Sequence, residues 1–319
     1  MFKAIAHPNF ALIKYWGKSD YDSNIPAMSS VSITLDSMKS ETTVSFPNGL
    51  SKDRWILNGI EQLSLGQIES PLQSLKKIAS IEDFCQIESN NDFPTAAGLA
   101  SSASGIASLV TALNAAFELN LSTQQLVESA LEGSGSAPRS LFSGYVYLEA
   151  LNDQVRCKTV LDPEQWPLEV IVCITSNKKK FISSRKGMEI TKQTSPKYWD
   201  WVNSQEQNVA IALNAIEAKN FEQLRQVSEQ NCLEMHKVMQ ASDPPINYWN
   251  EITYACVEKV REIQDRGLAV FFTIDAGPQV KIICESDASE EVLFFMKRES
   301  GIQSIIQSGL GEGSRIIYE

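Results

Sequence analysis

Strand-like and helix-like segments follow one another in this chain without the regular alternation that builds a doubly wound sheet. The segment "SVSITLD" (30–36) alternates apolar and polar residues, and "SETTVSF" (40–46) follows after a short polar turn, so the pair predicts a hairpin. A helix face is indicated by apolar residues at positions 99, 103, 106, 110, 113 and 117. This mixed order favours an α+β fold over a doubly wound α/β sheet.

The second half contains long helical patterns and short apolar strands. The run "EVIVCIT" (169–175) is typical of a buried strand, and the basic segment "SNKKKFISSRKG" that follows it predicts a domain junction. We therefore predict two domains, residues 1–177 and 178–319. Further helices are predicted over 122–132, 203–219, 221–240, 252–267 and 290–299, and further strands over 144–149, 269–275 and 280–285.

Charge and composition limit the function classes. The chain has 319 residues and a formal net charge of -11, which argues against nucleic acid or an anionic membrane as partner. No apolar run reaches the ~18 residues of a membrane span, and the N-terminus lacks the apolar core of a signal peptide. The six cysteines are scattered and show no zinc spacing, so we expect reduced thiols and a cytoplasmic protein.

Two lysines stand close together in "ALIKYWGKSD". Lys14 and Lys18 flank Tyr15, Trp16 and Gly17 in a chain that is acidic overall. Like charges repel at short range, so a small anion held between the two ammonium groups would explain the arrangement. The alternative is that one lysine extends to solvent from a strand end and the other lies in a loop.

The segment "PTAAGLASSASG" (94–105) is the strongest local signal for ligand binding. Gly98 permits an unusual backbone conformation, and the hydroxyls of Ser101, Ser102 and Ser104 add donors where a helix begins. Free N–H groups and the helix dipole favour phosphate at such a place. The alternative is a helix of small residues that packs tightly on a sheet.

Three other segments carry candidate chemistry. "GSGSAPRS" combines Ser134 and Ser136 with the planar guanidinium of Arg139, which suits carboxylate or phosphate, although a helix cap followed by a solvated arginine would read the same. In the basic run, Arg185 with its preceding serines resembles another anion clamp, although a solvated loop is the usual explanation. "FTIDAGPQV" places Asp275 after an apolar strand, either as a turn cap or as a catalytic acid.

Taken in order, these segments resemble the GHMP family of small-molecule kinases, and within it the diphosphomevalonate decarboxylases. The resemblance rests on five blocks that extend from Ala11 to Pro278. They are "IKYWGKSD", "NDFPTAAGLASSASG", "GSGSAPRS", "SSRKGMEITKQTS" and "FTIDAGP".

The resemblance implies an N-terminal ribosomal-S5-like domain and a C-terminal ferredoxin-like domain, with the active site in the cleft between them. It implies ATP-dependent decarboxylation of mevalonate 5-diphosphate to isopentenyl diphosphate, through transient phosphorylation of the 3-hydroxyl. Asp275, Lys14 and Arg139 are implied as catalytic residues. Substrate is implied to contact Tyr15, Lys18, Ser134, Ser136, Arg139, Ser184, Arg185 and Met188, and ATP to contact Ala97, Gly98, Leu99, Ala100, Ser101, Ser102 and Ser104.

The resemblance also implies Mg²⁺ as the ion that bridges the ATP phosphates, and a homodimer. The chain departs from the family pattern at Met28, where asparagine is expected, and at Pro138, which stiffens the loop before Arg139. Neither change removes a reacting group. The main alternative is a kinase or decarboxylase of the same fold that acts on mevalonate or mevalonate 5-phosphate, and a binding protein without turnover is a second.

Overall fold

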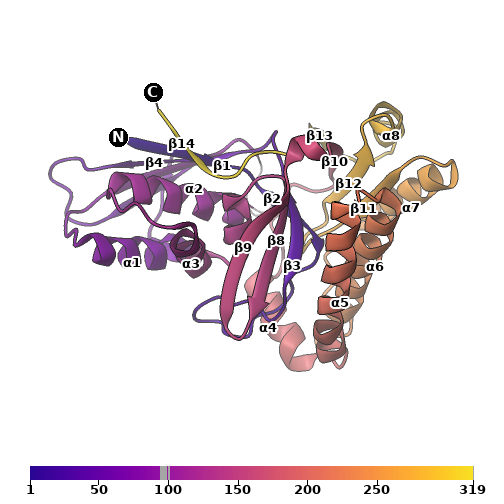
Figure 1. Cartoon of the computed structure of the whole chain (residues 1–319), viewed down its shortest axis with the longest axis horizontal. Coiled ribbons are helices and arrows are strands. Elements are labelled where there is room, and N and C mark those ends of the chain that lie inside the picture. Colours follow the sequence, from indigo (N-terminus) through magenta and orange to yellow (C-terminus); the bar gives the residue numbers. More distant parts are fainter. Residues whose placement is uncertain (94–98, 100, 319) are drawn as a thin grey trace.

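The computed structural model describes residues 1–93, 99 and 101–318, and it has the α+β architecture that the sequence predicts (Figure 1). Helices α1 (Glu69–Ala79), α2 (Ser101–Ala116) and α3 (Thr123–Gly133) cover one face of the first sheet, and η1 (Gly66–Ile68) leads into α1. The strand order of this sheet is β14 (Arg315–Ile317), β1 (Phe2–Ala6), β4 (Ser40–Ser45), β7 (Gln86–Asn91), β5 (Arg54–Leu57) and β6 (Ile60–Glu61).

The predicted hairpin between residues 30–36 and 40–46 is wrong. Strand β3 (Ser30–Thr34) pairs with β2 (Asn9–Ile13) and β8 (Tyr145–Leu151), whereas β4 lies in the first sheet between β1 and β7. The connection does not form a tight turn because Leu35 and Met38 within it are buried in the core. The polar side chains of β3 are also buried. The alternation of polar and apolar residues in this strand therefore does not mark one face in the core and one face in solvent.

Two smaller sheets complete the fold. Strand β9 (Gln154–Leu161) extends the β2-β3-β8 sheet, and the short helix η2 (Ala137–Leu141) packs beside it. The third sheet has the order β11 (Val270–Thr273), β12 (Val280–Glu285), β10 (Leu168–Ile174) and β13 (Ser304–Ser308). Helices α6 (Phe221–Gln240), α7 (Glu251–Asp265) and α8 (Ser289–Met296) pack on this sheet, whereas α5 (Tyr198–Glu217) packs on β2, β3 and β9 of the second. Helix α4 (Ser184–Thr194) packs on α5 and α6, and the short helix η3 (Pro163–Gln165) precedes β10.

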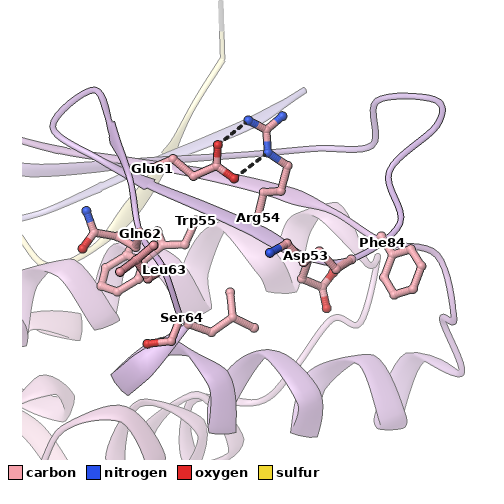
Figure 2. A pocket seen from close by; sticks show the side chains of 10 residues that line it. Asp53, Arg54, Trp55, Glu61, Gln62, Leu63, Ser64 and Phe84 are labelled. Carbon is pink, nitrogen blue, oxygen red and sulfur yellow. Dashed lines mark hydrogen bonds and ion pairs between the residues drawn. The ribbon is translucent and has the colours of Figure 1, made fainter.

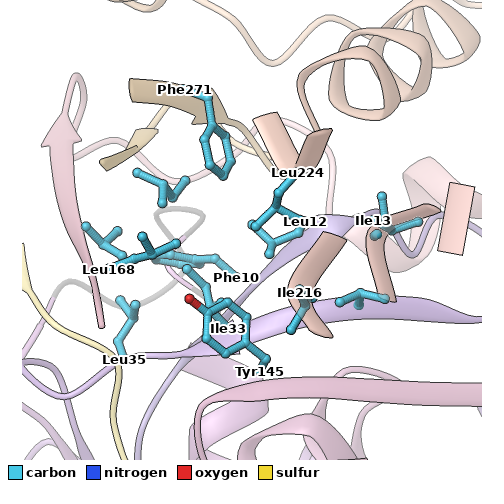
Figure 3. Packing of buried hydrophobic residues seen from close by; sticks show 14 of the residues in the cluster. Phe10, Leu12, Ile13, Ile33, Leu35, Tyr145, Leu168, Ile216, Leu224 and Phe271 are labelled. Atoms are coloured by element: carbon cyan, nitrogen blue, oxygen red, sulfur yellow. The ribbon is translucent and has the colours of Figure 1, made fainter. Parts of the chain in front are cut away.

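One hydrophobic cluster joins the second and third sheets (Figure 3). Phe10 and Leu12 from β2 lie in it with Phe271 from β11, and Ile216 of α5 and Leu224 of α6 complete the contact. All five side chains are buried. Because such cores pack as densely as organic crystals, the ends of β2 and β11 are held at a fixed separation. The residues that follow these two strands are therefore positioned precisely.

Two features bear on the predicted domain limit between residues 177 and 178, which stays a prediction. Strand β10 ends before that limit, yet it pairs with β12 and β13. The C-terminal strand β14 returns to pair with β1 at the edge of the first sheet. Within the described part of the chain, no helix is both long enough and apolar enough to cross a membrane.

Candidate active site

Asp275 and Lys14 meet where two strands of different sheets end. Lys14 directly follows β2, and Asp275 comes two residues after β11; the hydroxyl of Thr273 donates to Ala11 O at 3.0 Å and ties the two strands together. The buried Lys14 Nζ donates to Asp275 Oδ1 at 2.7 Å, and it also donates to Ala11 O at 2.9 Å. Of the two lysines in "ALIKYWGKSD", Lys14 thus forms an ion pair with a carboxylate of the chain itself.

A second ammonium binds the same carboxylate. Lys281 Nζ lies 3.2 Å from Asp275 Oδ2, and the Lys281 side chain is fully buried, whereas the Asp275 side chain is 27% exposed. Burial raises the pKa of Asp275, but Lys14 and Lys281 outweigh burial and hold the pKa well below its usual range. Burial lowers the pKa of Lys281, against the attraction of Asp275. Asp275 is therefore a carboxylate at neutral pH.

Helix α6 fixes the backbone on both sides of this cluster. Asn231 Oδ1 accepts a hydrogen bond from the N–H of Lys14 at 2.8 Å, and Cys232 Sγ accepts one from the N–H of Ile274 at 3.2 Å. His236 Nε2 lies 3.1 Å from Ile274 O, and burial lowers the pKa of His236 to about 3. One helix face thus holds the residues next to Lys14 and Asp275 in register.

Arg139 is buried and surrounded by neutral groups. Its Nε donates to Asn9 Oδ1 at 2.9 Å and its Nη1 to Ser30 Oγ at 2.7 Å, and its guanidinium carbon lies 5.9 Å from the Tyr15 ring centroid. Burial lowers the pKa of Arg139. The alternative interpretation, a solvated arginine, is wrong, because Arg139 is only 4% exposed.

Lys18 and Arg185 converge on a single amide. Asn24 Oδ1 accepts hydrogen bonds from Lys18 Nζ and from Arg185 Nη1, the second at 3.4 Å. Arg185 Nη2 also donates to Tyr21 O at 2.6 Å. Burial, with repulsion from Arg185, lowers the pKa of Lys18 to about 8 against the attraction of Asp20. Lys18 is 3% exposed, so the loop holds a buried cation.

These three cations share one property. Among the residues that the structure describes, no carboxylate forms an ion pair with Lys18, Arg139 or Arg185. Lys18 and Arg139 are buried, whereas Arg185 is exposed. Buried charges in proteins are normally paired, because removing an unpaired charge from water costs several kcal/mol in a real protein and on the order of 20 kcal/mol in the idealised limit. The arrangement is suited to an anion supplied from outside the chain.

The other predicted substrate residues have different surroundings. Ser134 and Ser136 hydroxyls lie 3.2 Å apart, and Ser184 Oγ accepts from Lys180 Nζ at 2.7 Å. Met188 is 5% exposed and packs in a buried cluster with Trp16, Met28 and Tyr198. Met28, where the family pattern departs, therefore fills a core position.

Gly135 lies where no side chain would fit. A Cβ there would lie 2.3 Å from the hydroxyl oxygen of Tyr15. This hydroxyl is buried, and it has no hydrogen-bond partner among the described residues. Pro138 stands in the first turn of η2, directly before Arg139, and its fixed φ suits that position. The "GSGSAPRS" segment thus shapes the space beside Tyr15.

Two family models together match most of the chain. A diphosphomevalonate decarboxylase-like N-terminal domain matches residues 6–159, and a mevalonate 5-diphosphate decarboxylase C-terminal domain matches residues 170–315. The chain belongs to the diphosphomevalonate decarboxylase family. A family member from Candida albicans is 34% identical over 342 residues, which cover 96% of this chain and 94% of the relative.

Solved structures of the same enzyme family have the same fold, which confirms the GHMP architecture. The complex of MDDEF with MVAPP, AMPPCP and magnesium has a TM-score of 0.92 and 36% identity, and the match covers 100% of this chain and 99% of that one. The mevalonate diphosphate decarboxylase from Staphylococcus aureus has a TM-score of 0.93 and 36% identity, over 99% of this chain and 98% of that one.

The predicted nucleotide loop lies only partly within the described residues. Ala97, Gly98 and Ala100 are outside them; Leu99 is buried, and Ser101 begins α2. The Ser104 hydroxyl lies 2.7 Å from Ser40 Oγ of β4 and is fully buried, so Ser104 fastens α2 to the sheet. Tight packing of the small-residue helix on the sheet is thus confirmed at Ser104. Phosphate binding by this segment stays a prediction.

Sequence reasoning missed several residues that complete this decarboxylase site. Lys281, Asn9, Ser30, Asn24 and Asn231 all contact a predicted site residue. Of these residues, only Lys281 could have been recognised from the sequence, because it is a charged residue inside the otherwise apolar run "VKIIC". The others are neutral polar residues from separate segments, which only the fold brings together.

A separate cavity lies at the start of β5 (Figure 2). Its volume is about 250 Å³, and Arg54 and Glu61 form an ion pair of 2.8 Å at its edge. Trp55 and Phe84 also line it. None of the predicted site residues of the decarboxylase lines this cavity, so it is distinct from the cluster around Asp275.

Proposed function

We propose that this chain binds mevalonate 5-diphosphate and ATP and converts them to isopentenyl diphosphate, ADP, phosphate and carbon dioxide. The single observation that carries this proposal is the placement of an ionised Asp275 between Lys14 and Lys281. It is supported by the buried cations Lys18 and Arg139 and the exposed Arg185, which form no ion pair with a carboxylate in the described chain. The relatives named for this activity cover nearly the whole chain.

Asp275 is the residue that we assign to the 3-hydroxyl of the substrate. Its oxygens accept from Lys14 and Lys281, and its low pKa makes it a weak base, so it would orient the hydroxyl through a hydrogen bond. As the O–P bond forms and the hydroxyl becomes more acidic, its proton would pass to the Asp275 carboxylate. Lys14, whose ammonium is fixed by Ala11 O, would stabilise the charge on the transferring phosphoryl group.

Lys18, Arg139 and Arg185 are assigned to the anionic ends of the substrate. Arg139 presents a planar fork that suits a carboxylate or phosphate, and Asn9 and Ser30 hold that fork by two of its nitrogens. Lys18 and Arg185 lie together at Asn24 and would take the diphosphate. Tyr15, Ser134, Ser136 and Ser184 would complete the polar lining.

The chemical sequence follows from these positions. The 3-oxygen displaces ADP from the γ-phosphorus of ATP and becomes a phosphate ester. The C3–O bond then breaks and releases phosphate, and the electrons of the C1–C2 bond form the alkene as carbon dioxide leaves. A guanidinium that holds the substrate carboxylate in place until this step keeps the breaking bond aligned.

A magnesium ion would be held mainly by the nucleotide. Within the described ranges, no group of three His, Cys, Asp or Glu side chains gathers to make a metal cage. Mg²⁺ usually binds through one or two protein ligands together with phosphates and water. When bound, it would neutralise charge on the phosphate oxygens, and the hydroxyls of Ser101 and Ser102 near the loop are the candidate protein ligands.

A parallel assay tests the proposed function. Purified protein is given Mg-ATP with mevalonate, mevalonate 5-phosphate or mevalonate 5-diphosphate, and both ADP and released carbon dioxide are followed. We expect equal ADP and carbon dioxide with the diphosphate alone. ADP without carbon dioxide, or preference for a less phosphorylated acid, would instead assign a same-fold kinase or a decarboxylase of another substrate.

Location and assembly are separate proposals. A cytoplasmic location is supported by the six free cysteines, of which Cys157 alone is not buried. A homodimer rests on the family resemblance. Sedimentation velocity of the purified chain at several concentrations measures its mass directly, and a monomer at all of them would overturn the dimer.

A further inference from the structure

Asn24 is the meeting point of three segments of the site. Its Oδ1 accepts from Lys18 Nζ and Arg185 Nη1, and its Nδ2 donates to Glu132 O at 2.8 Å, near the end of α3. Because the nitrogen faces a carbonyl and the oxygen faces two cations, only one orientation of the amide satisfies all the partners. The side chain is 5% exposed.

The amide oxygen holds two cations without cancelling their charge. Nearby carboxylates are engaged elsewhere: Glu189, one turn after Arg185 on α4, pairs with Lys186 at 2.9 Å. Asp20 accepts from the N–H of Asp22 and from the Ser23 hydroxyl. Neither carboxylate forms an ion pair with Lys18 or Arg185, so both cations can bind an anionic ligand.

The backbone at Asn24 restricts which residues fit. Its φ is +58°, in the left-handed region that glycine, asparagine and aspartate adopt most readily. Asparagine and aspartate have nearly the same shape, so the difference between them at this position is electrostatic. An aspartate would keep an oxygen toward the two cations and would neutralise one of them. It would also lose the hydrogen bond to Glu132 O, a loss that a glycine at this position shares.

We propose that Asn24 is a positioning and specificity residue: its uncharged oxygen sets the spacing of Lys18 and Arg185 for a two-phosphate chain and keeps both cations available to it. This inference rests on the proposed function, because the anion is taken to be the substrate diphosphate. Asn24 acts through the two cations, so its loss alters substrate binding more than the chemical step.

Asn24→Asp is the first test, measured by steady-state kinetics with each substrate varied in turn. An internal carboxylate competes with the diphosphate, so we expect KM for mevalonate 5-diphosphate to rise by about tenfold or more. The KM for ATP should stay within about twofold and kcat within about threefold. Unchanged KM for mevalonate 5-diphosphate, or equal rises for both substrates, would overturn the proposal.

Asn152→Asp is the matched control. Asn152 lies in the exposed turn between β8 and β9 and has a φ of +50°, so the same substitution adds the same charge to the same backbone conformation. Its kinetic constants should equal those of the wild type. A rise in its KM to match Asn24→Asp would mean that net charge alone weakens binding, which overturns a specific role for Asn24.

Asn24→Gly separates electrostatics from structure. Glycine keeps the left-handed backbone and removes the amide oxygen that contacts Lys18 and Arg185, without adding charge. We therefore expect KM for mevalonate 5-diphosphate to rise by about threefold, less than in Asn24→Asp. A merely structural role predicts the reverse order, since glycine removes every contact. An unchanged KM in Asn24→Gly, or one above that of Asn24→Asp, would overturn the proposal.

Binding of inorganic pyrophosphate keeps the two proposals distinguishable. If the wild type turns over none of the three acids, the proposed function fails, but calorimetry with pyrophosphate still tests Asn24. Weaker binding to Asn24→Asp than to the wild type and Asn152→Asp supports the inference. Equal binding to all three overturns it, and thermal melts establish that each variant compared is folded.

Discussion

The ammonium of Lys281 lies 3.2 Å from Oδ2 of Asp275, while the other carboxylate oxygen accepts from Lys14. One partly exposed anion therefore faces two buried cations, and the cluster keeps a net positive charge. This balance favours the ionised form of Asp275 and also makes the space in front of it attractive to phosphate. The pKa of Asp275 should therefore depend on Lys281.

Lys281→Met should move the acid limb of the pH profile. With one cation removed, burial has more influence, so the pKa of Asp275 rises. The profile of kcat/KM for mevalonate 5-diphosphate should therefore begin to fall at a higher pH than in the wild type. Lys259→Met, which removes a lysine paired with Glu262 on α7, is the control. Identical acid limbs in all three proteins would contradict the assignment.

Asp275→Asn should abolish turnover and leave ATP binding nearly intact. An amide cannot hold the ionised state, and its NH₂ group would face a lysine ammonium. We expect kcat to fall by roughly 100-fold or more, with the Kd for ATP, measured by calorimetry, within about twofold. Asp287→Asn in the exposed turn before α8 is the matched control. Near-normal kcat in Asp275→Asn would remove this residue from the reaction.

Sequence patterns predicted the elements better than their pairing. Helix α6 spans Phe221–Gln240, as its apolar spacing predicts, because a helix is specified by local periodicity. The strands β3 and β4 were also located, but their partners lie far along the chain in different sheets. Pairing depends on which buried faces meet, and that is a property of the whole fold.

The candidate site was predicted in part for a related reason. Lys14, Arg139 and Asp275 stand in motifs whose composition is unusual, so they were recognisable in the sequence. Asn24 and Asn231 are ordinary polar residues that become informative only when the fold places them against a cation or a backbone N–H. Contacts between segments more than 200 residues apart, such as that of Lys14 with Asn231, have no local signature.

Arg139→Lys should weaken substrate use although the charge is kept. A single ammonium cannot donate to Asn9 and Ser30 and also present a planar fork, so we expect a loss of about 2 kcal/mol in kcat/KM for mevalonate 5-diphosphate. The KM for ATP should change little. Arg156→Lys, on the exposed side of β9, provides the comparison, and unchanged kinetics in Arg139→Lys would mean that the fork is not used.

Gly17→Ala should destabilise the fold around Tyr198. A Cβ at Gly17 would lie 1.9 Å from the Tyr198 hydroxyl oxygen, and the φ of Gly17 is +139°. Gly49→Ala is the matched control, because its φ is +83° and nothing lies within 4 Å of the added Cβ. We expect the free energy of unfolding to fall by about 1–3 kcal/mol more in Gly17→Ala than in Gly49→Ala. Equal losses in urea denaturation would mean that the tyrosine moves away freely.

Affinity for the substrate should fall as the pH rises through about 8, where Lys18 titrates. Burial and the repulsion of Arg185 depress the pKa of Lys18, and Asp20 opposes them, so the ammonium is present below pH 8 and is lost above it. A neutral amine no longer attracts the diphosphate. The Kd for mevalonate 5-diphosphate, measured by calorimetry at pH 7 and pH 9.5, should therefore be larger at the higher pH.

Lys18→Arg decides whether Lys18 is the group that titrates. A guanidinium stays charged across this range, so the variant should lose most of the rise in Kd between pH 7 and pH 9.5. Lys180 is the competing group, since burial and repulsion from Lys281 lower its pKa to about 8 as well, against the attraction of Asp275. If Lys18→Arg keeps the full pH dependence while Lys180→Arg removes it, the titration belongs to Lys180, and Lys18 holds its substrate as a permanent cation.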